Sequence, residues 1–314
     1  MFEAKAALFL YAVSPVHMGM GAAIGVVDNP IQRERHTGHP MFAGSGIKGA
    51  ARELWEASGG DQGESLARRI FGPDKNASDF AGAVSFSDAQ LVLFPVRAAR
   101  RAFVYATCPT ALSRAARLLE IAESRKGFPP VPALEPNQAF VAADDGLLHQ
   151  GQLGLEWHAQ PAKADPAVAK VAGWLAAHAL PAGSAHAHFR GLLEKNLALI
   201  SDEDFGFFVR QSTSIEPHVR IDDETGTADD GGLFYTENLP PESLLVALVM
   251  ASRERGRNGS GMAAREVMKT LRAGKPPVPA LDGALLQIGG DATCGRGHVC
   301  LHFTEASEPK ETKQ

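Results

Sequence analysis

The 314-residue chain is predicted to fold as an α+β protein with an antiparallel sheet. Strand-like segments do not alternate one for one with helices, as a doubly wound parallel sheet requires, and several neighbouring strands are joined by short turns. The apolar share of 45% is ample for a buried core. No internal repeat or dividing linker is visible. We therefore expect one domain over residues 1–306, followed by a charged tail at 307–314.

The first elements are a strand, a long loop and a helix. The apolar run Lys5–Val13 is expected to be a strand, because Glu3 and the lack of a small-residue cleavage site argue against a signal peptide. Ser14–His39 is rich in Gly, His and charge without periodicity, and loops of this length are usually functional. Apolar residues at helical spacing predict a helix over Ser45–Ser58, ended by a glycine pair.

The middle of the chain alternates strands with helices less regularly. Apolar and aromatic runs predict strands at Ala83–Val96 and Arg101–Thr107, and a helix follows from about Thr110 to Ser124. A proline-rich crossing then leads to further elements. These are strands at Asn137–Ala143 and Gln152–His158 and a helix over Asp165–Leu180.

The last third contains a helix start, a hairpin and the closing strands. Ser201 precedes three acidic residues, the pattern of a capped helix N-terminus. Two strands flank a turn rich in Gly, Thr and Asp, which predicts a β-hairpin within about 211–238 that projects. The expected elements are the hairpin strands Ile215–Ile221 and Gly232–Glu237, a strand at Leu244–Met250, a basic helix over about Ser260–Ala273, and strands at Ala284–Ile288 and His298–Phe303.

Composition excludes several classes of protein. The net charge of −5 opposes uniform coating of nucleic acid, so RNA binding would need local basic patches, and Arg97–Lys126 and Arg253–Lys275 are such segments. These segments can equally be solvated helix faces. The three cysteines form no CxxC pair or disulfide framework, which suits a reducing cytoplasm, and no apolar run is long enough to span a membrane.

The loop Gly44–Gly49 matches the GxGxxG pattern, but no strong strand precedes it and no acidic residue closes a second strand, so a dinucleotide site is disfavoured. Outward amides at a helix start and the charge of a lysine can instead hold a phosphate, such as that of a nucleic-acid backbone. A tight structural turn is the alternative. The candidate RNA-binding residues here are Gly44, Ser45, Gly46, Lys48 and Arg52.

A second glycine loop, Gly289–Gly297, lies between the two closing strands and is not a Walker motif. Glycines and an arginine between strands make a surface against which a sugar-phosphate chain can lie. An ordinary hairpin loop is the alternative. The candidate RNA-binding residues are Gly289, Gly290, Gly295, Arg296 and Gly297.

These loops and three further segments resemble the RAMP superfamily of CRISPR proteins, and within it the backbone subunits of type III-B, or Cmr, effector complexes. The match spans the chain. Its most specific part runs from Gly25 to Pro40 and continues into the first glycine loop. The other segments are Ser14–Gly19, Leu233–Glu242 and the closing glycine loop.

The resemblance implies a ferredoxin-like, RNA-recognition-like palm with the hairpin as an inserted thumb. It also implies copies stacked along a guide crRNA, contacts with other subunits of the complex, and cleavage of the paired single-stranded target RNA. An aspartate matching Asp28 would be catalytic and would bind a divalent ion, Mg²⁺ or Mn²⁺. Asn29 stands where a leucine is expected in the family, which could alter the packing of this loop.

Three further residues within the matching segments are candidates for assisting Asp28 in RNA cleavage. His17 has the pKa range to move a proton, and Glu237 and Tyr235 could assist from the base of the thumb. A loop histidine is more often merely exposed or packed, and a surface aspartate is usually a turn residue. A non-catalytic, structural RNA-binding subunit is therefore the main alternative, and a nucleotide-using enzyme is disfavoured.

Overall fold

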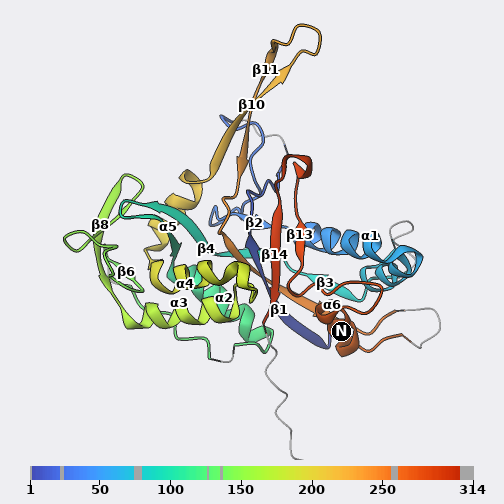
Figure 1. The fold of residues 1–314 in the computed structure, drawn as a ribbon. Coiled ribbons are helices and arrows are strands. Elements are labelled where there is room, and N and C mark those ends of the chain that lie inside the picture. The colour runs from blue at the N-terminus through green and yellow to red at the C-terminus, as the bar shows by residue number, and fades with distance from the viewer. Residues whose placement is uncertain are drawn as a thin grey trace, which may run out of the picture.

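The computed structural model describes residues 2–21, 25–73, 80–125, 127–134, 137–255 and 261–304. The charged tail at 307–314 lies outside these ranges. Helices and sheets are mixed along the chain, as the α+β prediction requires (Figure 1). The helices are α1 (Gly44–Phe71), α2 (Pro109–Ile121), α3 (Pro166–His178), α4 (Ala187–Asn196), α5 (Asp202–Gln211) and α6 (Ala264–Ala273). The strands are β1 (Ala4–Ala12), β2 (Met41–Phe42), β3 (Val84–Phe86), β4 (Ala89–Ala98), β5 (Arg101–Thr107), β6 (Ala139–Val141), β7 (Gln152–Leu155), β8 (His158–Ala164), β9 (Leu197–Leu199), β10 (Ser214–Ile221), β11 (Ala228–Asn238), β12 (Leu244–Ala251), β13 (Leu285–Gln287) and β14 (His298–Phe303).

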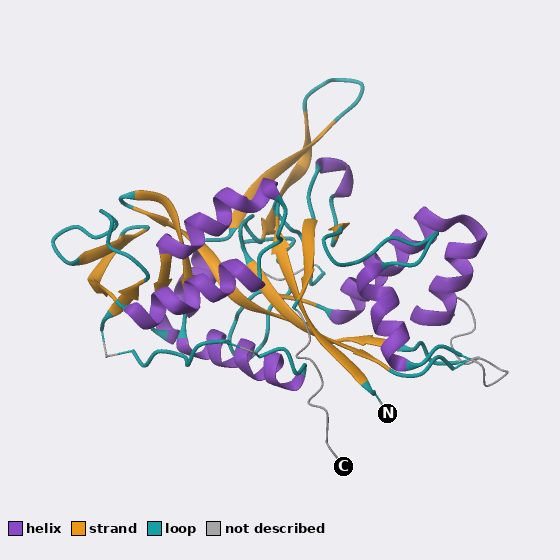
Figure 2. Cartoon of the chain, turned by 60° about the horizontal axis from the view of Figure 1, so that its bottom comes forward, coloured by secondary structure: helices purple, strands orange, loops and turns teal. Residues whose placement is uncertain are grey.

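The core is built on both faces of one sheet, whose order is β13-β14-β1-β12-β4-β5-β9-β6-β8-β7. Side chains of β1 alternate between the faces, as strand geometry demands. Leu8 and Leu10 belong to the apolar cluster that includes residues of α1 and α6, whereas Phe9 and Tyr11 belong to the cluster that includes most buried residues of α2 and α3. Helices therefore cover both faces of the central strands (Figure 2).

The prediction of an antiparallel sheet holds for the centre and fails at one side. The neighbours β14, β1, β12 and β4 pair antiparallel throughout, but β5 pairs β9 and β6 pairs β8 in parallel. The strand β9 was not predicted, and neither were α4 and β8. The sequence of β8, HAQPAKA, is mostly exposed, so it carries little of the alternating pattern that marks a strand.

Three predicted boundaries are wrong. The strand expected over Gln152–His158 ends at Leu155, because a turn at Glu156 and Trp157 reverses the chain into β8. The glycine pair was expected to end the first helix, but Gly60 only kinks it, with φ 51° and ψ −151°, and helix resumes to Phe71. The expected strand over Ala83–Val96 forms as two separate strands, β3 and β4, and each of them pairs with β12. Local residues mark where the chain bends, and long-range packing decides which structure forms after the bend.

Caps and closing strands match the expectations. Ser201 Oγ accepts a hydrogen bond from the Asp204 backbone N–H at 3.0 Å, so α5 begins where predicted. Asp165 Oδ1 caps α3 in the same way, at 2.7 Å from the Ala167 nitrogen. The strands β5 and β14 have the predicted bounds, Arg101–Thr107 and His298–Phe303.

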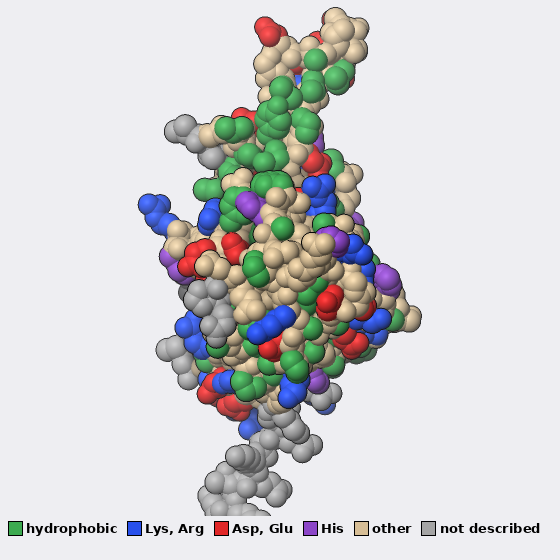
Figure 3. Space-filling view, turned by 90° about the vertical axis from the view of Figure 1, so that its left-hand side faces the viewer, with side chains coloured by type: hydrophobic (Ala, Val, Ile, Leu, Met, Phe, Trp, Pro, Cys, Tyr) green, Lys and Arg blue, Asp and Glu red, His purple; other side chains and the backbone are tan. Residues whose placement is uncertain are grey.

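The hairpin β10–β11 forms its own two-stranded sheet and stands away from the body (Figures 1 and 3). Its register pairs Val219 with Leu233, and both side chains are about half exposed, at 46% and 54%. A column of hydrophobic side chains runs up one side of the hairpin (Figure 3). No helix among the described residues is long and apolar enough to cross a membrane.

Candidate functional site

The long loop after β1 is docked on the edge of β11 at the base of the hairpin. Asn29 and Thr236 form a parallel bridge, in which the Asn29 N–H donates to the Tyr235 carbonyl and the Glu237 N–H donates to the Asn29 carbonyl, both at 3.0 Å. The Tyr235 N–H donates to Asp28 Oδ2 at 2.8 Å. The main chain of β11 therefore holds Asp28 by one carboxylate oxygen while its side chain stays exposed.

His17 is held on the same edge of β11. Its Nδ1 lies 2.7 Å from the Glu237 carbonyl oxygen. Because a carbonyl can only accept, Nδ1 carries the proton, and Nε2 faces away as an acceptor in the neutral ring. A Cβ on Gly19 would lie 2.8 Å from Nε2, so the glycine at this position leaves room for the ring. Tyr235, which holds Asp28, and Glu237, which holds His17, are two residues apart on an extended strand, so these two anchors are about 7 Å apart.

Glu237 is a buried tie between the loop and the hairpin, with 5% of its surface exposed. Its carboxylate pairs with the Arg33 guanidinium and accepts hydrogen bonds from the Ile31 N–H at 3.0 Å and the Thr213 hydroxyl at 2.8 Å. Arg33 also donates to the Val209 carbonyl in α5 at 2.8 Å. The loop that carries Asp28 is thereby joined to both α5 and β11.

Arg296 of the closing glycine loop holds the other face of the same strand. Its guanidinium donates to Asn238 Oδ1 at 2.7 Å and pairs with the Glu216 carboxylate, and the residue is only 7% exposed. Successive residues of a strand point to opposite faces, so Glu237 and Asn238 face opposite ways. Two arginines from distant loops therefore clamp the hairpin base from its two faces.

The closing glycine loop also sets the backbone of His17. The Gly290 N–H donates to the His17 carbonyl at 2.8 Å, and the Gly297 N–H donates to the Pro15 carbonyl at 2.8 Å. Gly289 has φ 91°, and a Cβ there would lie 2.4 Å from the His17 carbonyl oxygen. Glycine is therefore required for this close approach. Gly295 is exposed, and nothing lies within 4 Å of a Cβ built on it.

The first glycine loop forms the N-terminus of α1. The Gly44 N–H donates to Asp88 Oδ1 at 2.8 Å, and a Cβ on Gly46 would lie 2.1 Å from the Met18 methyl group. Ser45 is exposed beside them. Lys48 is half-buried, and burial, followed by the nearby charge of Arg52, lowers its pKa. The Arg52 guanidinium binds Glu56 at 2.6 Å.

The structure brings together most of the predicted site residues from five separate stretches of sequence. Asp28, His17, Tyr235 and Glu237 meet at the hairpin base, and both glycine loops lie against the Pro15–Gly19 segment. Arg296 is buried in ion pairs rather than presented to solvent, because the structure gives its charge a protein partner. The partners Arg33, Asn238 and Glu216 were not predicted, since the residues around a polar side chain carry no local signal of which distant group it faces.

A divalent ion would find few protein ligands here. Among the described residues, no group of three or more His, Cys, Asp or Glu side chains is placed to hold a metal. The Glu237 carboxylate is already engaged by three donors, which leaves the exposed Asp28 carboxylate. Mg²⁺ is commonly bound by one or two carboxylates together with substrate phosphates and water. The residues therefore fit an ion held by the Asp28 carboxylate together with phosphate and water oxygens, and they do not form a complete metal site by themselves.

The fold and the clamped hairpin base define a protein of the RAMP superfamily, whose family model matches residues 9–300, and the chain belongs to that superfamily. Over 302 residues it is 32% identical to the CRISPR system Cmr endoribonuclease Cmr4 of Pyrococcus furiosus, with 95% of each chain covered. The crystal structure of oligomeric Cmr4 from Pyrococcus furiosus has a TM-score of 0.69 and 25% identity, covering 98% of this chain and 100% of that one. A chain of the type III-B Cmr-beta complex bound to cognate target RNA shares the fold, with a TM-score of 0.71, 17% identity and coverage of 96% and 98%.

Proposed function

We propose that this chain is a crRNA-binding backbone subunit of a type III-B CRISPR ribonucleoprotein and that it cleaves the guide-paired, single-stranded target RNA. The observation that carries the proposal is the anchoring of Asp28 and His17 side by side on one edge of β11, at the base of a projecting hairpin. The likeness to a named Cmr endoribonuclease over nearly the whole chain supports it. Other copies of this chain and other Cmr subunits would be its partners.

The palm of this subunit is proposed to be the ferredoxin-like unit made by β1, β4, β12 and β14. In support, the strand order β14-β1-β12-β4 is antiparallel at each pairing, and α1 and α6 contribute to the same apolar cluster. The opposite face of these strands is packed against α2 and α3, so RNA would not lie on the sheet itself. The hairpin β10–β11 would be the thumb, and the guide would pass its base.

Cleavage is proposed to use the 2′-hydroxyl of the target. Its oxygen forms a bond to the adjacent phosphorus, the bond from phosphorus to the 5′-oxygen breaks, and the products end in a 2′,3′-cyclic phosphate and a 5′-hydroxyl. Asp28 orients the 2′-hydroxyl and accepts its proton. His17 enters the step as an imidazolium, with Nδ1–H donating to the Glu237 carbonyl, and Nε2–H delivers its proton to the departing 5′-oxygen. The strand groups that anchor the two side chains are about 7 Å apart, and the Asn29 backbone is bonded between them, so the phosphodiester would lie over this edge.

Tyr235 and Glu237 are proposed to act by holding this arrangement. The Tyr235 N–H fixes one oxygen of Asp28, and the Tyr235 side chain is half-buried beside it. Glu237 supplies the carbonyl for His17 and, through its carboxylate, the tie to Arg33. A buried carboxylate with three donors is poorly placed to exchange protons, so Glu237 would serve as a positioning residue.

The guide is proposed to contact the first turn of α1, where Ser45 is exposed, and the outer part of the closing glycine loop. Ser45 and Lys48 supply donors and charge at α1, and the open side of Gly295 lets a backbone approach. Arg296 would shape the loop from beneath. A bound Mg²⁺ or Mn²⁺, held by Asp28 and RNA phosphates, would supply neutralising charge at the cleaved phosphate.

The test uses an assembled complex and the variants Asp28→Asn and Asp61→Asn, the latter changing an exposed aspartate of α1. In the Asp28→Asn variant the side-chain amide oxygen can still accept from the Tyr235 N–H, so the loop keeps its anchor while the charge is lost. We expect cleavage of a matched target to fall a hundredfold or more with Asp28→Asn, with guide binding and target capture unchanged. The Asp61→Asn complex should cleave normally, and a target with 2′-deoxyribose at the cut should resist.

If the Asp28→Asn complex cleaves the target at the wild-type rate, the alternative of a structural subunit is favoured, in which partner proteins cut the RNA. Chelation of divalent ions tests the metal separately. Loss of cleavage on adding EDTA, restored by Mg²⁺ or Mn²⁺, supports a substrate-assisted ion, and cleavage unaffected by EDTA contradicts it.

A further inference from the structure

The turn between β7 and β8 carries an exposed tryptophan. Trp157 is 67% exposed, whereas the other two tryptophans of the chain, Trp55 and Trp174, are 0% and 8% exposed. The Glu156 N–H donates to the Arg97 carbonyl at 2.9 Å, so the turn is tied to β4. A single exposed apolar side chain is ordinary on a protein surface, and the rings around Trp157 are therefore what matters.

Three aromatic rings meet at this turn. The Trp157 ring lies edge to face with Phe207 of α5, with centroids 6.4 Å apart, and the His158 ring meets Phe207 in the same way at 5.2 Å. Phe207 is half-buried against the core, and His158 is exposed. We call Trp157, His158 and Phe207 the aromatic platform. Its ring contacts fix the indole against α5 while most of the indole stays open to solvent.

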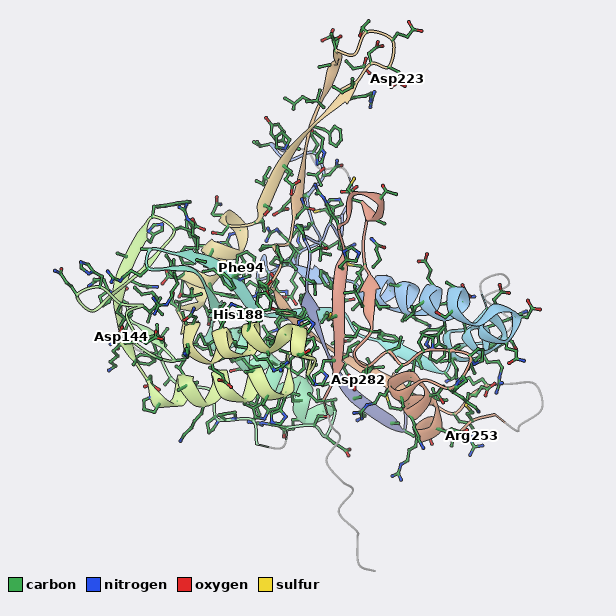
Figure 4. The ribbon with its side chains drawn as sticks, viewed as in Figure 1. Phe94, Asp144, His188, Asp223, Arg253 and Asp282 are labelled. Atoms are coloured by element: carbon green, nitrogen blue, oxygen red, sulfur yellow. The ribbon has the colours of Figure 1, made fainter. Side chains whose placement is uncertain are left out.

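The helix α5 connects the platform to the hairpin base. Its buried face packs in the core cluster that includes Phe94, which is labelled in Figure 4. Arg33, which pairs with Glu237, donates to the Val209 carbonyl of α5 and to the Gly38 carbonyl, both at 2.8 Å. Figure 1 shows α5 running into β10 on the side of the molecule where β8 lies. The platform therefore continues the surface that begins at the proposed cleavage site.

Arg210 lies between the platform and the loop that carries Asp28. It follows Phe207 by three residues on α5, so the two side chains are neighbours on the helix surface. A Cβ on Gly38 would lie 3.3 Å from Arg210 Nη1, which places the guanidinium against that loop. Arg210 is exposed, and no ion pair between it and another described residue is found. Its charge is available to a phosphate on this side of the platform.

Acids balance the cations around the platform. Glu156 lies 3.3 Å from Arg97, whose side chain is 71% exposed. Glu203 and Asp204 precede Phe207 by four and three residues on α5, at the end of the helix away from Arg210. The surface beside the indole therefore has no excess of positive charge. It suits an uncharged planar group, with a phosphate only on the Arg210 side.

We propose that the aromatic platform stacks an unpaired nucleobase of single-stranded RNA, whose backbone passes Arg210 on its way to the hairpin base. A nucleobase is planar and uncharged, and stacking on an exposed aromatic ring tolerates any base sequence. The nearby arginine would hold the adjoining phosphate and set the position of the strand. This inference rests on the proposed function and adds an RNA contact remote from Asp28.

The test uses the full chain, first alone, then assembled with guide RNA, and then with target RNA added. Because Trp157 is the exposed tryptophan, the difference in emission between the wild-type and Trp157→Phe proteins isolates its signal. Its access to acrylamide, a neutral quencher, is measured at each stage. Filter binding at several salt concentrations gives the RNA affinity of Trp157→Ala, Trp157→Phe and Arg210→Ala. The control is Ile121→Ala, at a 40% exposed position at the end of α2.

Bound RNA is expected to shield Trp157 from acrylamide. Trp157→Ala should weaken RNA binding at least about fivefold without changing the log-log salt slope, because a stacked base brings no phosphate contact. Trp157→Phe keeps an aromatic ring and should bind close to wild type. Arg210→Ala should lower the slope by about 0.7, and Ile121→Ala should change neither affinity nor slope. Shielding on addition of guide assigns the base to the guide, and shielding only on addition of target assigns it to the target.

Unchanged acrylamide access at both additions, or wild-type RNA affinity of the Trp157→Ala complex, would overturn the stacking site. If Trp157→Ala weakens assembly with other Cmr subunits while RNA affinity persists, the platform binds protein and this inference is wrong. A wild-type complex that binds neither guide nor target would instead overturn the proposed function. A complex that binds and cleaves RNA while Trp157 stays unshielded overturns this inference alone, so the two failures are distinguishable.

Discussion

The ion pair between Arg33 and Glu237 provides the sharpest quantitative test of how the site is held. The Arg33 and Glu237 side chains are 19% and 7% exposed. Replacing Arg33 by Met leaves a buried carboxylate without its cation, and breaking a buried pair in this way costs about 3–5 kcal/mol. The Ile31 N–H and the Thr213 hydroxyl still bind the carboxylate, so we expect the lower end, about 3 kcal/mol.

The double variant Arg33→Met/Glu237→Gln separates the lost pair from lost packing. Exchanging a buried pair for uncharged groups is often nearly neutral, so the double variant should recover about half or more of the single loss. Unfolding in urea, followed by circular dichroism, measures both, and the single loss corresponds to a Tm lower by on the order of 6 °C.

The matched control is the exposed pair of Arg125 and Glu120, whose side chains are 44% and 68% exposed. Arg125→Met should cost about 0.5 kcal/mol or less, because exposed pairs contribute little. If Arg33→Met is as mild as Arg125→Met, or if Arg33→Met/Glu237→Gln loses as much stability as Arg33→Met or more, the buried clamp is not what stabilises the hairpin base.

Three further predictions concern the loops and a buried acid. Lys48→Ala should lower the log-log salt slope of guide binding, measured by filter binding, by about 0.7. Arg296→Ala should leave this slope unchanged and lower the urea midpoint of unfolding, because Arg296 is buried in protein ion pairs. Equal losses of slope in both variants would contradict this division. Gly289→Ala should lower the free energy of unfolding by about 2 kcal/mol or more and slow cleavage, because the new Cβ meets the His17 carbonyl. Gly283→Ala, at φ 78° with nothing within 4 Å of the new Cβ, should lower it by about 1 kcal/mol. Similar losses in the two variants would show that the close approach to His17 is not the cause. Burial raises the pKa of Glu242 from 4.5 to about 7, so the folded state keeps a proton that the unfolded state has released, and stability is lost as the pH rises through this interval. Glu242→Gln should therefore stabilise the protein at pH 8 and change little at pH 4, and a pH-independent effect in urea unfolding would contradict the sign.

Much of the architecture was predictable because its signals are local. The apolar run of β1, the serine before α5 and the aspartate before α3 each specify an element through residues that are neighbours in the chain. The resemblance of residues 14–19 and 25–49 to a known family pointed to Asp28 as the reactive group. The structure places Asp28 at the hairpin base, where the Tyr235 N–H holds its carboxylate.

The sequence by itself determined which residues carry charge, which segments are apolar and where the chain must turn, because these properties belong to single residues and their neighbours. Only the tertiary structure decided that Arg296 is buried in an ion pair, that Glu237 pairs with Arg33, and that Nδ1 of His17 faces the Glu237 carbonyl. Arg33 and Glu237 are 204 residues apart. The free energy of a charge depends on what surrounds it, and for these residues the surroundings come from parts of the chain that no local pattern connects.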